Sequence, residues 1–413
     1  MVNHTPRSGS LDVLLISRCP PYPLHLGDRL IPYYLVRQLS GRGYQFDLLA
    51  FYQNPQDQAD IPYYERYFRD IQLIEELPRS PASLLERQVL APRRFPERLS
   101  ESWSPQMWQA VARQLQQKRG YDVIHFFGGV HVYEFRALTR DHPTIIVPYE
   151  SFSLYLERAL AQGRSLPQKL VTRLQLMMAR RYESWMYDGH RRVVVVSERD
   201  ADVLRRLNPL LPLHVIPNGV DIEYFAPTGH DPDRPTLLFT GNYEYAPNVD
   251  AAQRLIRQIF PRVRQAVPEA ELLIVGPHPP PSLRAQAGPG VQITGHVPDL
   301  RPYFEGATLY VSPLHIGAGI KNKILEALAM QTAVVATPLS CDGIAVTHGR
   351  DVVFALRTDE FVNQIVRLLK DPIARTRLAL NGRRLIERLY TWRRVADAYE
   401  HLYHAVIREH SGE

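Results

Sequence analysis

The sequence predicts an α/β protein with two doubly wound, Rossmann-like domains that face each other across a cleft. Three observations lead to this prediction. Short apolar, β-branched runs alternate with helical patterns along the chain. The alternation falls into two separate series. A segment rich in proline, glycine and aspartate, FAPTGHDPDRPT at 225–236, divides the two series and predicts a hinge.

The first series of strands predicts a first domain of residues 1–227. Its apolar runs are LDVLLIS (11–17), YDVIHFF (121–127), TIIVPYE (144–150) and RVVVVS (192–197). A loop that contains proline and glycine follows the first run and leads into a helical pattern at 28–43. Residues 53–119 show the least regular pattern, so we assign no elements there.

The second series predicts a second domain of residues 228–390. Its runs are TLLFTG (236–241), ELLIVG (271–276), VQITG (291–295), ATLYVS (307–312) and AVVAT (333–337). Because the strands of both series are apolar on both faces and have helical patterns between them, we expect parallel sheets covered by helices on both sides. An amphipathic pattern at 390–410 predicts a closing helix.

Composition narrows the class of protein. A chain of 413 residues is long enough for two domains, and 45% hydrophobic with 22% charged residues is typical of a folded soluble protein. The formal charge of +6 suits an anionic ligand or an acidic membrane surface and does not require nucleic acid. Two cysteines cannot form a disulfide framework, which fits a reducing cytoplasm. No run approaches the roughly 20 apolar residues of a membrane span, and the first apolar run is too short for a signal peptide.

The segment VSPLHIGAGIKNKILEALAM (311–330) holds the main candidate site. It predicts the end of a strand, a glycine loop and a helix. Gly317 and Gly319 allow the backbone to turn tightly and to approach a ligand closely. The first amides of the helix carry partial positive charge, and Lys321 adds a full charge beside them. Together these groups predict a cradle for a diphosphate that requires no metal.

Glu326 lies inside the apolar part of that helix, about one turn beyond Lys321. Its carboxylate could accept hydrogen bonds from a paired diol such as a ribose. The alternative is that Glu326 pairs with Lys323 or with an arginine on a solvated face. The apolar neighbours Leu325 and Ala327 disfavour this alternative. The loop also lacks the third glycine of the dinucleotide fingerprint, which disfavours a nicotinamide site.

The stretch GAGIKNKILEALAMQTAVVATPLSCDGI resembles the donor-site segment of the retaining glycosyltransferases of family 4, which have the GT-B fold of two Rossmann-like domains. Four further stretches are similar to the same family: PPYPLHLGDRLIPYYLVRQL, VVVVSERDADVL, VIPNGVDIEYF and FTGNYEYAPNVDAAQRLI. The resemblance therefore covers most of the chain. The donor loop is that of the branch with a G-x-G-x-K-x-K pattern.

The resemblance implies transfer of a hexosyl group from a nucleotide-sugar donor, held by the second domain, to a glycan or lipid-linked acceptor, held by the first. It implies retention of configuration, no metal and no cofactor, a role in polysaccharide or glycoconjugate biosynthesis, and a cytoplasmic location, free or at the inner face of the membrane. Lys321 and Glu326 become the catalytic candidates: Lys321 neutralises the diphosphate leaving group and Glu326 binds the donor ribose. The segment 391–413 becomes a helix that packs back on the first domain.

Two positions depart from the family pattern. Ala318 stands where the first glutamate of the E-x7-E motif is expected, whereas Glu326 matches the second. TGNYEYAPN (240–248) stands where an Arg/Lys pair is usual. The G-x-G-x-K-x-K branch commonly lacks both features. In the same stretch, Gly241 and Asn242 end a predicted strand and become further donor-binding candidates, and Asn248 is expected to cap the following helix.

Three residues of the first domain are candidates for the acceptor side. Gly27 lies in the loop after the first strand, and its neighbour Asp28 is expected to cap the next helix. Glu150 ends a strand and is either an acceptor ligand or proton carrier, or a carboxylate at the N-terminus of the next helix. His131 follows another strand, within which His125 is expected to be buried and hydrogen-bonded. No spacing of histidine, cysteine and carboxylate suggests a metal site.

The basic segment LPQKLVTRLQLMMARRYESWM (166–186) carries leucine, methionine and tryptophan at helical spacing. One interpretation is a helix packed on the core with solvated arginines. The other is a contact with an anionic membrane that carries a lipid-linked acceptor.

Two alternatives to sugar transfer stay open. A sugar-nucleotide epimerase of the same fold would need acid and base groups around the sugar, and the sequence offers no convincing set. A catalytically degenerate scaffold that only binds sugar nucleotides is favoured by Ala318 and the missing Arg/Lys pair, and is disfavoured by Lys321 and Glu326.

Overall fold

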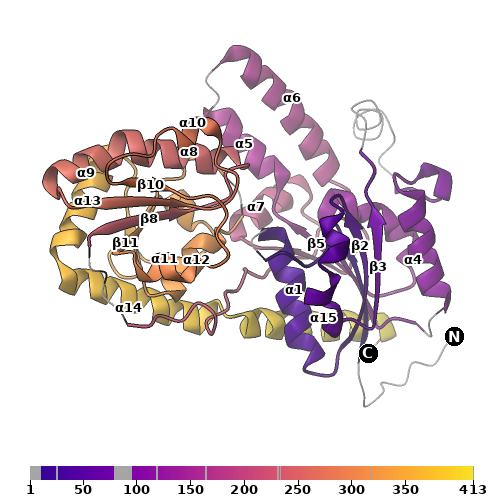
Figure 1. Cartoon of the computed structure of the whole chain (residues 1–413). Coiled ribbons are helices and arrows are strands. Elements are labelled where there is room, and N and C mark those ends of the chain that lie inside the picture. Colours follow the sequence, from indigo (N-terminus) through magenta and orange to yellow (C-terminus); the bar gives the residue numbers. More distant parts are fainter. Residues whose placement is uncertain are drawn as a thin grey trace. The chain divides into compact units, whose positions relative to one another are not determined.

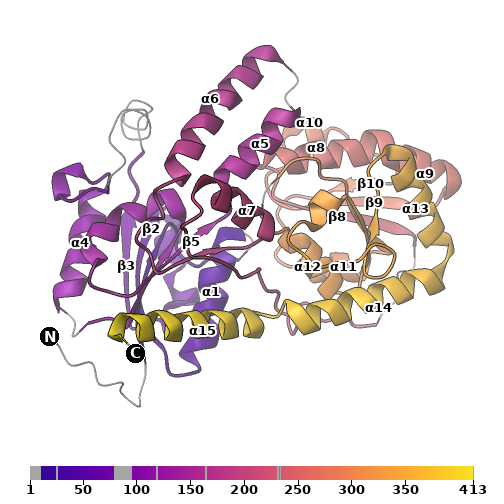
Figure 2. The same cartoon turned by 180° about the vertical axis from the view of Figure 1, so that it is seen from behind.

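The computed structural model describes residues 11–24, 27–78, 95–117, 120–162, 165–229, 232, 234–317 and 319–412. The chain forms two compact units, each built around one sheet (Figures 1 and 2). The first domain consists of residues 1–217 and 392–413, and the second domain of residues 218–391. This architecture confirms the predicted fold class of two Rossmann-like α/β domains.

In the described part of the first domain, seven strands form a sheet in the order β3-β2-β1-β4-β5-β6-β7. Every neighbouring pair is parallel. The strands are β1 (Asp12–Ser17), β2 (Gln45–Tyr52), β3 (Asp70–Glu75), β4 (Val123–Phe127), β5 (Thr144–Tyr149), β6 (Arg192–Val195) and β7 (Leu213–Val215). All five residues of β4, which reads VIHFF, are buried. Continuous apolar runs of this kind are typical of parallel strands covered on both faces.

Helices cover both faces of this sheet (Figures 1 and 2). The α-helices are α1 (Gly27–Ser40), α2 (Gln56–Ala59), α4 (Pro105–Gln117), α5 (Phe152–Gln162), α6 (Leu166–Glu183), α7 (Glu198–Leu207) and α15 (Trp392–Ser411). Short 3₁₀ helices are η1 (Ile61–Tyr63), η2 (Glu65–Tyr67), η4 (Leu99–Glu101), η5 (Gly129–His131) and η6 (Tyr133–Thr139).

The closing helix α15 is part of the first domain. The rings of Trp392 and Tyr34 of α1 stack with centroids 4.7 Å apart. The hydroxyl of Tyr403 lies 2.7 Å from Nδ1 of His125 in β4. His125 is only 1% exposed, which confirms the expectation of a buried, hydrogen-bonded histidine. The C-terminal segment therefore completes the core of the domain that the N-terminal segment begins.

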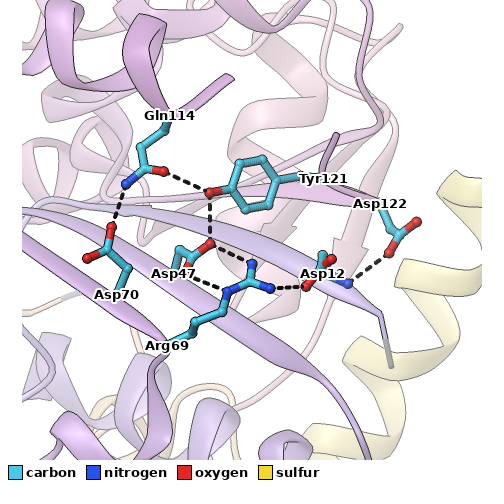
Figure 3. A network of polar contacts seen from close by, with 7 residues as sticks. All are labelled: Asp12, Asp47, Arg69, Asp70, Gln114, Tyr121 and Asp122. Atoms are coloured by element: carbon cyan, nitrogen blue, oxygen red, sulfur yellow. Dashed lines mark hydrogen bonds and ion pairs between the residues drawn. The ribbon is translucent and has the colours of Figure 1, made fainter. Parts of the chain in front are cut away.

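A polar network holds the amino ends of the first strands together (Figure 3). Arg69 donates to both carboxylate oxygens of Asp47, at 3.1 and 2.7 Å, and to Oδ1 of Asp12 at 2.8 Å. Asp47 is 1% exposed, so the guanidinium compensates a buried charge. The remaining members of the network are Asp70, Gln114, Tyr121 and Asp122. The network lies at the edge of the sheet opposite to the carboxyl ends of its strands.

In the described part of the second domain, six parallel strands form a sheet in the order β10-β9-β8-β11-β12-β13. The strands are β8 (Thr236–Thr240), β9 (Glu271–Val275), β10 (Val291–Ile293), β11 (Leu309–Ser312), β12 (Ala333–Ala336) and β13 (Val353–Phe354). The helices are α8 (Ala246–Arg254), the π-helix η7 (Leu255–Ile259), α9 (Phe260–Ala266), α10 (Pro281–Arg284), α11 (Arg301–Glu305), α12 (Asn322–Ala329), the 3₁₀ helix η8 (Pro338–Cys341), α13 (Thr358–Lys370) and α14 (Pro372–Leu389).

The second domain begins at residue 218, earlier than the expected start at 228. The segment between these positions is held to the second domain through its own backbone. Val220 pairs with Thr391 in a parallel bridge, and Arg383 of α14 donates to the carbonyl of Phe225 at 2.8 Å. The proline- and glycine-rich stretch therefore lies inside this domain and does not separate the two. Among the described residues, no helix has the length and apolar character needed to cross a membrane.

Candidate functional site

The two sheets have the topology that creates a ligand site at the carboxyl ends of adjacent strands. In the second domain, β8 and β11 are neighbours, but β8 leads to β9 and β10 on one side and β11 leads to β12 and β13 on the other. Ligands of doubly wound sheets bind where the strand order reverses in this way. Gly241 and Asn242 follow β8, and the loop 313–321 follows β11. The structure therefore brings the two predicted donor-binding segments to one edge of the sheet.

The glycine loop positions Lys321. Gly317 and Gly319 have φ angles of 142° and 63°, in the region that favours glycine. A Cβ atom at Gly317 would lie 3.1 Å from Cε of Lys321, so a side chain there would crowd the lysine. The Lys321 ammonium donates to the carbonyl of Gly319 at 2.7 Å. Lys321 is also the residue before α12, which places its charge beside the first amides of that helix. Ala318 lies outside the described residues.

Glu326 is buried in α12, with 6% of its surface exposed. Both of its carboxylate oxygens lie 3.0 Å from Nζ of Lys323. Burial raises the pKa of Glu326, and the charge of Lys323 opposes this shift. Glu326 therefore pairs with Lys323, as the alternative predicted. Its carboxylate is buried, however, and does not lie on a solvated face. A carboxylate offers about four acceptor positions, so Glu326 can accept further hydrogen bonds.

At the same edge of the sheet, the backbones of the loops after β8 and β9 approach each other closely. A Cβ atom at Gly276, after β9, would lie 2.0 Å from the carbonyl oxygen of Gly241. The side chain of Asn248 donates to the carbonyl of Asn242 at 2.8 Å. The expectation that Asn248 caps α8 is wrong, because the helix begins at Ala246 and Asn248 lies inside its first turn. Asn248 instead fixes the loop that carries Gly241 and Asn242.

Two residues near this edge were not predicted. Asn218 donates to the side chain of Asn322, the first residue of α12, at 2.7 Å. The Tyr245 hydroxyl lies 3.4 Å from the position that a Cβ at Gly317 would take. Asn218 lies about a hundred positions from α12 in the chain, so local patterns could not connect the two.

The acceptor-side candidates of the first domain also share one edge. Gly27 is the first residue of α1 and follows β1, His131 follows β4, and Glu150 follows β5. β4 lies between β1 and β5 in the sheet. The carboxyl ends of these strands therefore bring the three loops together.

At the start of α1, Asp28 does not act as the helix cap. The helix begins at Gly27, so Asp28 lies within its first turn. Its carboxylate lies 3.2 Å from a guanidinium nitrogen of Arg18, which follows β1. Arg18 lies against Gly128, where a Cβ atom would come within 2.3 Å of the arginine side chain. Arg18 is thus a cation at the candidate edge that the sequence patterns did not indicate.

His131 and Glu150 are held in defined loops. Nδ1 of His131 lies 2.8 Å from a carboxylate oxygen of Glu76. Glu150 follows Tyr149, whose φ of 81° is rare for a residue with a side chain. The next amides, of residues 152 and 153, donate to Glu183 at 2.8 and 3.1 Å. Because Glu183 caps α5, the capping role considered for Glu150 at these amides is already filled.

Among the described residues, no three histidine, cysteine or acidic side chains are grouped so that they could hold a metal ion. Both sets of candidates instead combine glycine turns, helix N-termini and single charged groups. The donor-side set can accommodate an anion beside Lys321 and hydroxyl groups beside Glu326.

Each domain matches a glycosyltransferase family model of its own. The model described as "Glycosyltransferase Family 4" matches residues 32–224, and the model described as "Glycosyl transferases group 1" matches residues 234–371. The uncharacterized 44.6 kDa protein in the cps region of Klebsiella pneumoniae is 21% identical over 394 residues, which are 93% of this chain and 97% of that protein.

Two further proteins are similar to this chain. The phosphatidyl-myo-inositol mannosyltransferase of Mycobacterium tuberculosis is 29% identical over 206 residues, which are 46% of this chain and 53% of that protein. The crystal structure of Anabaena HepE in complex with UDP superposes with a TM-score of 0.65 and 13% identity, over 96% of this chain and 100% of that one. Both domains match glycosyltransferase descriptions and the whole chain matches the fold, so the chain belongs to the glycosyltransferases with the GT-B fold.

Proposed function

We propose that this glycosyltransferase moves a hexosyl group from a nucleotide-sugar donor to a glycan or lipid-linked acceptor, with retention of configuration and without a metal ion. The observation that carries the proposal is the position of Lys321. Its ammonium lies over the glycine turn, next to the N-terminus of α12 and at the switch point of the second sheet. An activated sugar has its diphosphate as the leaving group, and these groups suit a diphosphate.

Lys321 and the α12 amides would act on the leaving group. When the glycosidic bond ionises, negative charge grows on the departing diphosphate. Fixed positive groups aimed at that charge lower the barrier more than they stabilise the bound donor. The complex of HepE with UDP supports a nucleotide donor, because this protein has the same fold. We propose a front-face mechanism, in which the acceptor attacks on the side from which the diphosphate departs; it requires no protein nucleophile, and we nominate none.

Glu326 would bind the ribose of the donor. The charge of Lys323 opposes the rise in the pKa of Glu326 that burial causes, and the acceptor positions that Lys323 does not use are available to a diol. Gly241, Asn242, Gly317 and Gly319 complete the proposed donor side as points of close backbone approach.

The acceptor side is assigned to the first domain, with Gly27, His131 and Glu150 at its edge. The relative in the Klebsiella cps region and the mycobacterial mannosyltransferase, named for an inositol phospholipid, support a glycan or lipid-linked acceptor. The proposed setting is polysaccharide or glycoconjugate biosynthesis in the cytoplasm.

Two variants test the donor site. Lys321→Ala should lower turnover about 10²–10³-fold, the range seen when one transition-state electrostatic partner is removed. Glu326→Ala should weaken donor binding by about tenfold or more, because it removes charged hydrogen bonds to the ribose. Calorimetry with UDP, GDP and their sugars should show weaker binding in both. Lys370→Ala, at the exposed end of α13, is the matched control and should behave as wild type. Unchanged binding and turnover in the folded Lys321 and Glu326 variants would reject the assignment.

Product analysis separates the competing activities. Incubation of the wild-type protein with a panel of nucleotide sugars should give slow donor hydrolysis, with the released sugar in the anomeric configuration of the donor, both with and without a chelator. Interconversion of the sugar would instead establish an epimerase. Binding without either reaction would establish a scaffold.

A further inference from the structure

Helix α6 of the first domain has two apolar faces. Its inner face packs on α5, where Leu176 and Ala179 form a cluster with Leu156. Away from this inner face, α6 exposes five large apolar side chains: Leu166 at 84%, Leu170 at 61%, Val171 at 55%, Leu174 at 51% and Met177 at 60%. A helix at the surface of a globular domain ordinarily has one apolar stripe, directed to the core. The interpretation that the whole leucine and methionine pattern of α6 packs on the core is therefore wrong.

Four of these side chains, all except Val171, form one continuous stripe, which we call the outer stripe of α6. Their spacing of four, four and three residues places them above one another on the helix surface. The figures show α6 at the margin of the first domain, with one long side that no other element of that domain covers (Figures 1 and 2). Exposed apolar side chains that gather in this way mark an interaction surface.

Cations border the outer stripe along one side. At about 100° per residue, Lys169, Arg173 and Arg180 fall on the same flank of the helix, next to the stripe. Arg180 also pairs with Glu157 of α5 at 2.8 Å, and both side chains are partly exposed. Arg181, in the last turn, lies in line with the stripe beyond Met177 and adds a positive charge at its end. The exposed surface of α6 is thus apolar along its centre and basic beside it.

We propose that the outer stripe of α6 docks on a membrane surface rich in anionic lipids. An apolar stripe with a flank of lysine and arginine is the pattern of helices that lie in the plane of the interface. Their apolar side chains enter the acyl boundary by roughly 5–10 Å, and the cations meet lipid phosphates. A membrane is favoured over a protein partner, because the whole flank carries one sign of charge, which matches a uniformly anionic lipid surface.

This surface is distinct from the donor site and does not depend on sugar chemistry. Its two components make separate contributions. Each leucine that inserts should strengthen binding about tenfold, and each cation near an anionic surface about fivefold. The charge component should weaken with added salt, whereas the apolar component should not.

The experiment is co-sedimentation of the full-length protein with vesicles of phosphatidylglycerol and phosphatidylcholine, or of phosphatidylcholine alone. The apolar variant is Leu170→Ser, Leu174→Ser, Met177→Ser, and the charge variant is Lys169→Gln, Arg173→Gln. The control variant is Leu210→Ser, Ile373→Ser, because these side chains are 92% and 81% exposed at other places. Tryptophan fluorescence checks that each variant is folded, and donor hydrolysis without vesicles should be unchanged in all of them.

Support requires that wild type and control bind the anionic vesicles more tightly than the neutral ones. The apolar variant should lose binding by at least about a hundredfold, and the charge variant should lose about 25-fold at low salt. The proposal is overturned if wild type does not bind anionic vesicles at low salt, or if the apolar variant binds as wild type does. It is also overturned if sedimentation shows a wild-type dimer that the apolar variant dissociates, since a second copy would then cover the stripe.

Discussion

Gly317 fixes the position of a catalytic candidate through the absence of a side chain. Its φ of 142° and the short distance from its Cβ position to Lys321 make the site unsuitable for any other residue. Gly317→Ala should therefore displace the Lys321 ammonium and weaken donor binding by about tenfold or more, as loss of a charged contact of about 1.5–3 kcal/mol does. Calorimetric titration with the preferred donor measures the effect.

A second glycine provides the control for this substitution. Gly349 also has a positive φ, of 75°, but a Cβ atom there would meet nothing within 4 Å. Gly349→Ala should cost stability through backbone strain and leave donor binding intact. If both variants bind the donor as tightly as wild type, Gly317 does not position Lys321 for binding.

His125 should make the first domain sensitive to acid. Burial lowers its pKa from 6.5 to about 3, so the folded protein keeps it neutral. Unfolding below pH 6.5 takes up a proton, and stability that is complete above this pH is lost as the pH falls towards 3. The free energy of unfolding should decrease by up to about 1.4 kcal/mol per pH unit from this residue alone.

The variant His125→Asn tests this origin of acid sensitivity. An asparagine keeps a polar atom near the Nδ1 position, which contacts the Tyr403 hydroxyl, but it does not titrate. Urea unfolding at several pH values should give a shallower dependence than in wild type. The buried His190, whose pKa is also lowered, should account for part of the slope that remains. An unchanged slope would mean that His125 does not take up the proton.

At the scale of single residues, the sequence patterns predicted the positions of the candidate site residues better than they predicted the side-chain contacts of those residues. Lys321 and Glu326 are where the loop–helix pattern predicts them, because glycines, charge and apolar spacing are local in the sequence. Asp28 and Asn248 were predicted to cap their helices, but each lies one or more residues inside its helix. A shift of this size decides whether a side chain caps a helix or contacts a neighbouring loop.

At the scale of elements, the N-terminus of α5 depends on a carboxylate from α6. Glu183 is 2% exposed and accepts hydrogen bonds from two α5 amides and from the Ser151 hydroxyl. Glu183→Ala would leave these donors buried without a partner, at about 1–3 kcal/mol each. The free energy of unfolding of the first domain should fall by about 2–5 kcal/mol.

Tryptophan fluorescence measures this loss in one domain. All four tryptophans, Trp103, Trp108, Trp185 and Trp392, belong to the first domain. Glu157→Ala is the control, because the ion pair of Glu157 with Arg180 is solvent-exposed and should contribute less than about 1 kcal/mol. Equal stabilities for the two variants would show that the cap contributes little.

Whether a strand could be predicted from the sequence depended on whether its buried residues form a continuous apolar run. The predicted strands have continuous apolar runs, and the ends of each strand lie within two residues of the predicted ends. β2 was missed because Asp47 interrupts its apolar pattern, and the ion pair that permits this residue is made by distant Arg69. β13 has only two residues and shows no pattern. The outer stripe of α6 has the same composition as a core face, so only the packing distinguishes the two.

At the scale of the whole molecule, the first domain needs both ends of the chain. Trp392, Tyr399 and Tyr403 of α15 are all buried. Removing a large buried aromatic costs about 3–5 kcal/mol, so the loss of three approaches the whole stability of a domain, about 5–15 kcal/mol. A chain that ends at Thr391 should therefore lack a folded first domain.

Calorimetry distinguishes the outcomes for this truncated chain. The second domain, residues 218–391, keeps its own sheet and core and should retain one cooperative transition. Proteolysis should digest the remaining first-domain residues and spare the second domain. Two transitions at wild-type temperatures would show that α15 is dispensable for folding.

The sequence predicted the type of sheet in each domain but not the long-range contacts that organise it. Two series of apolar runs predict two doubly wound sheets, and such sheets place ligands at the carboxyl ends of their strands. The contacts that organise the donor edge, such as that between Asn218 and Asn322, join residues far apart in sequence. The domain boundary was misplaced for a related reason: Val220 is tied to Thr391 at the other end of the domain.

The ion-paired rim of the first sheet has a practical consequence for protein engineering (Figure 3). Arg69 and its acidic partners fasten the strands at the rim that carries none of the acceptor candidates. The scaffold is therefore anchored away from the loops that follow β1, β4 and β5. Those loops can be exchanged for the loops of another glycosyltransferase to redirect acceptor choice, while the anchoring rim is left untouched.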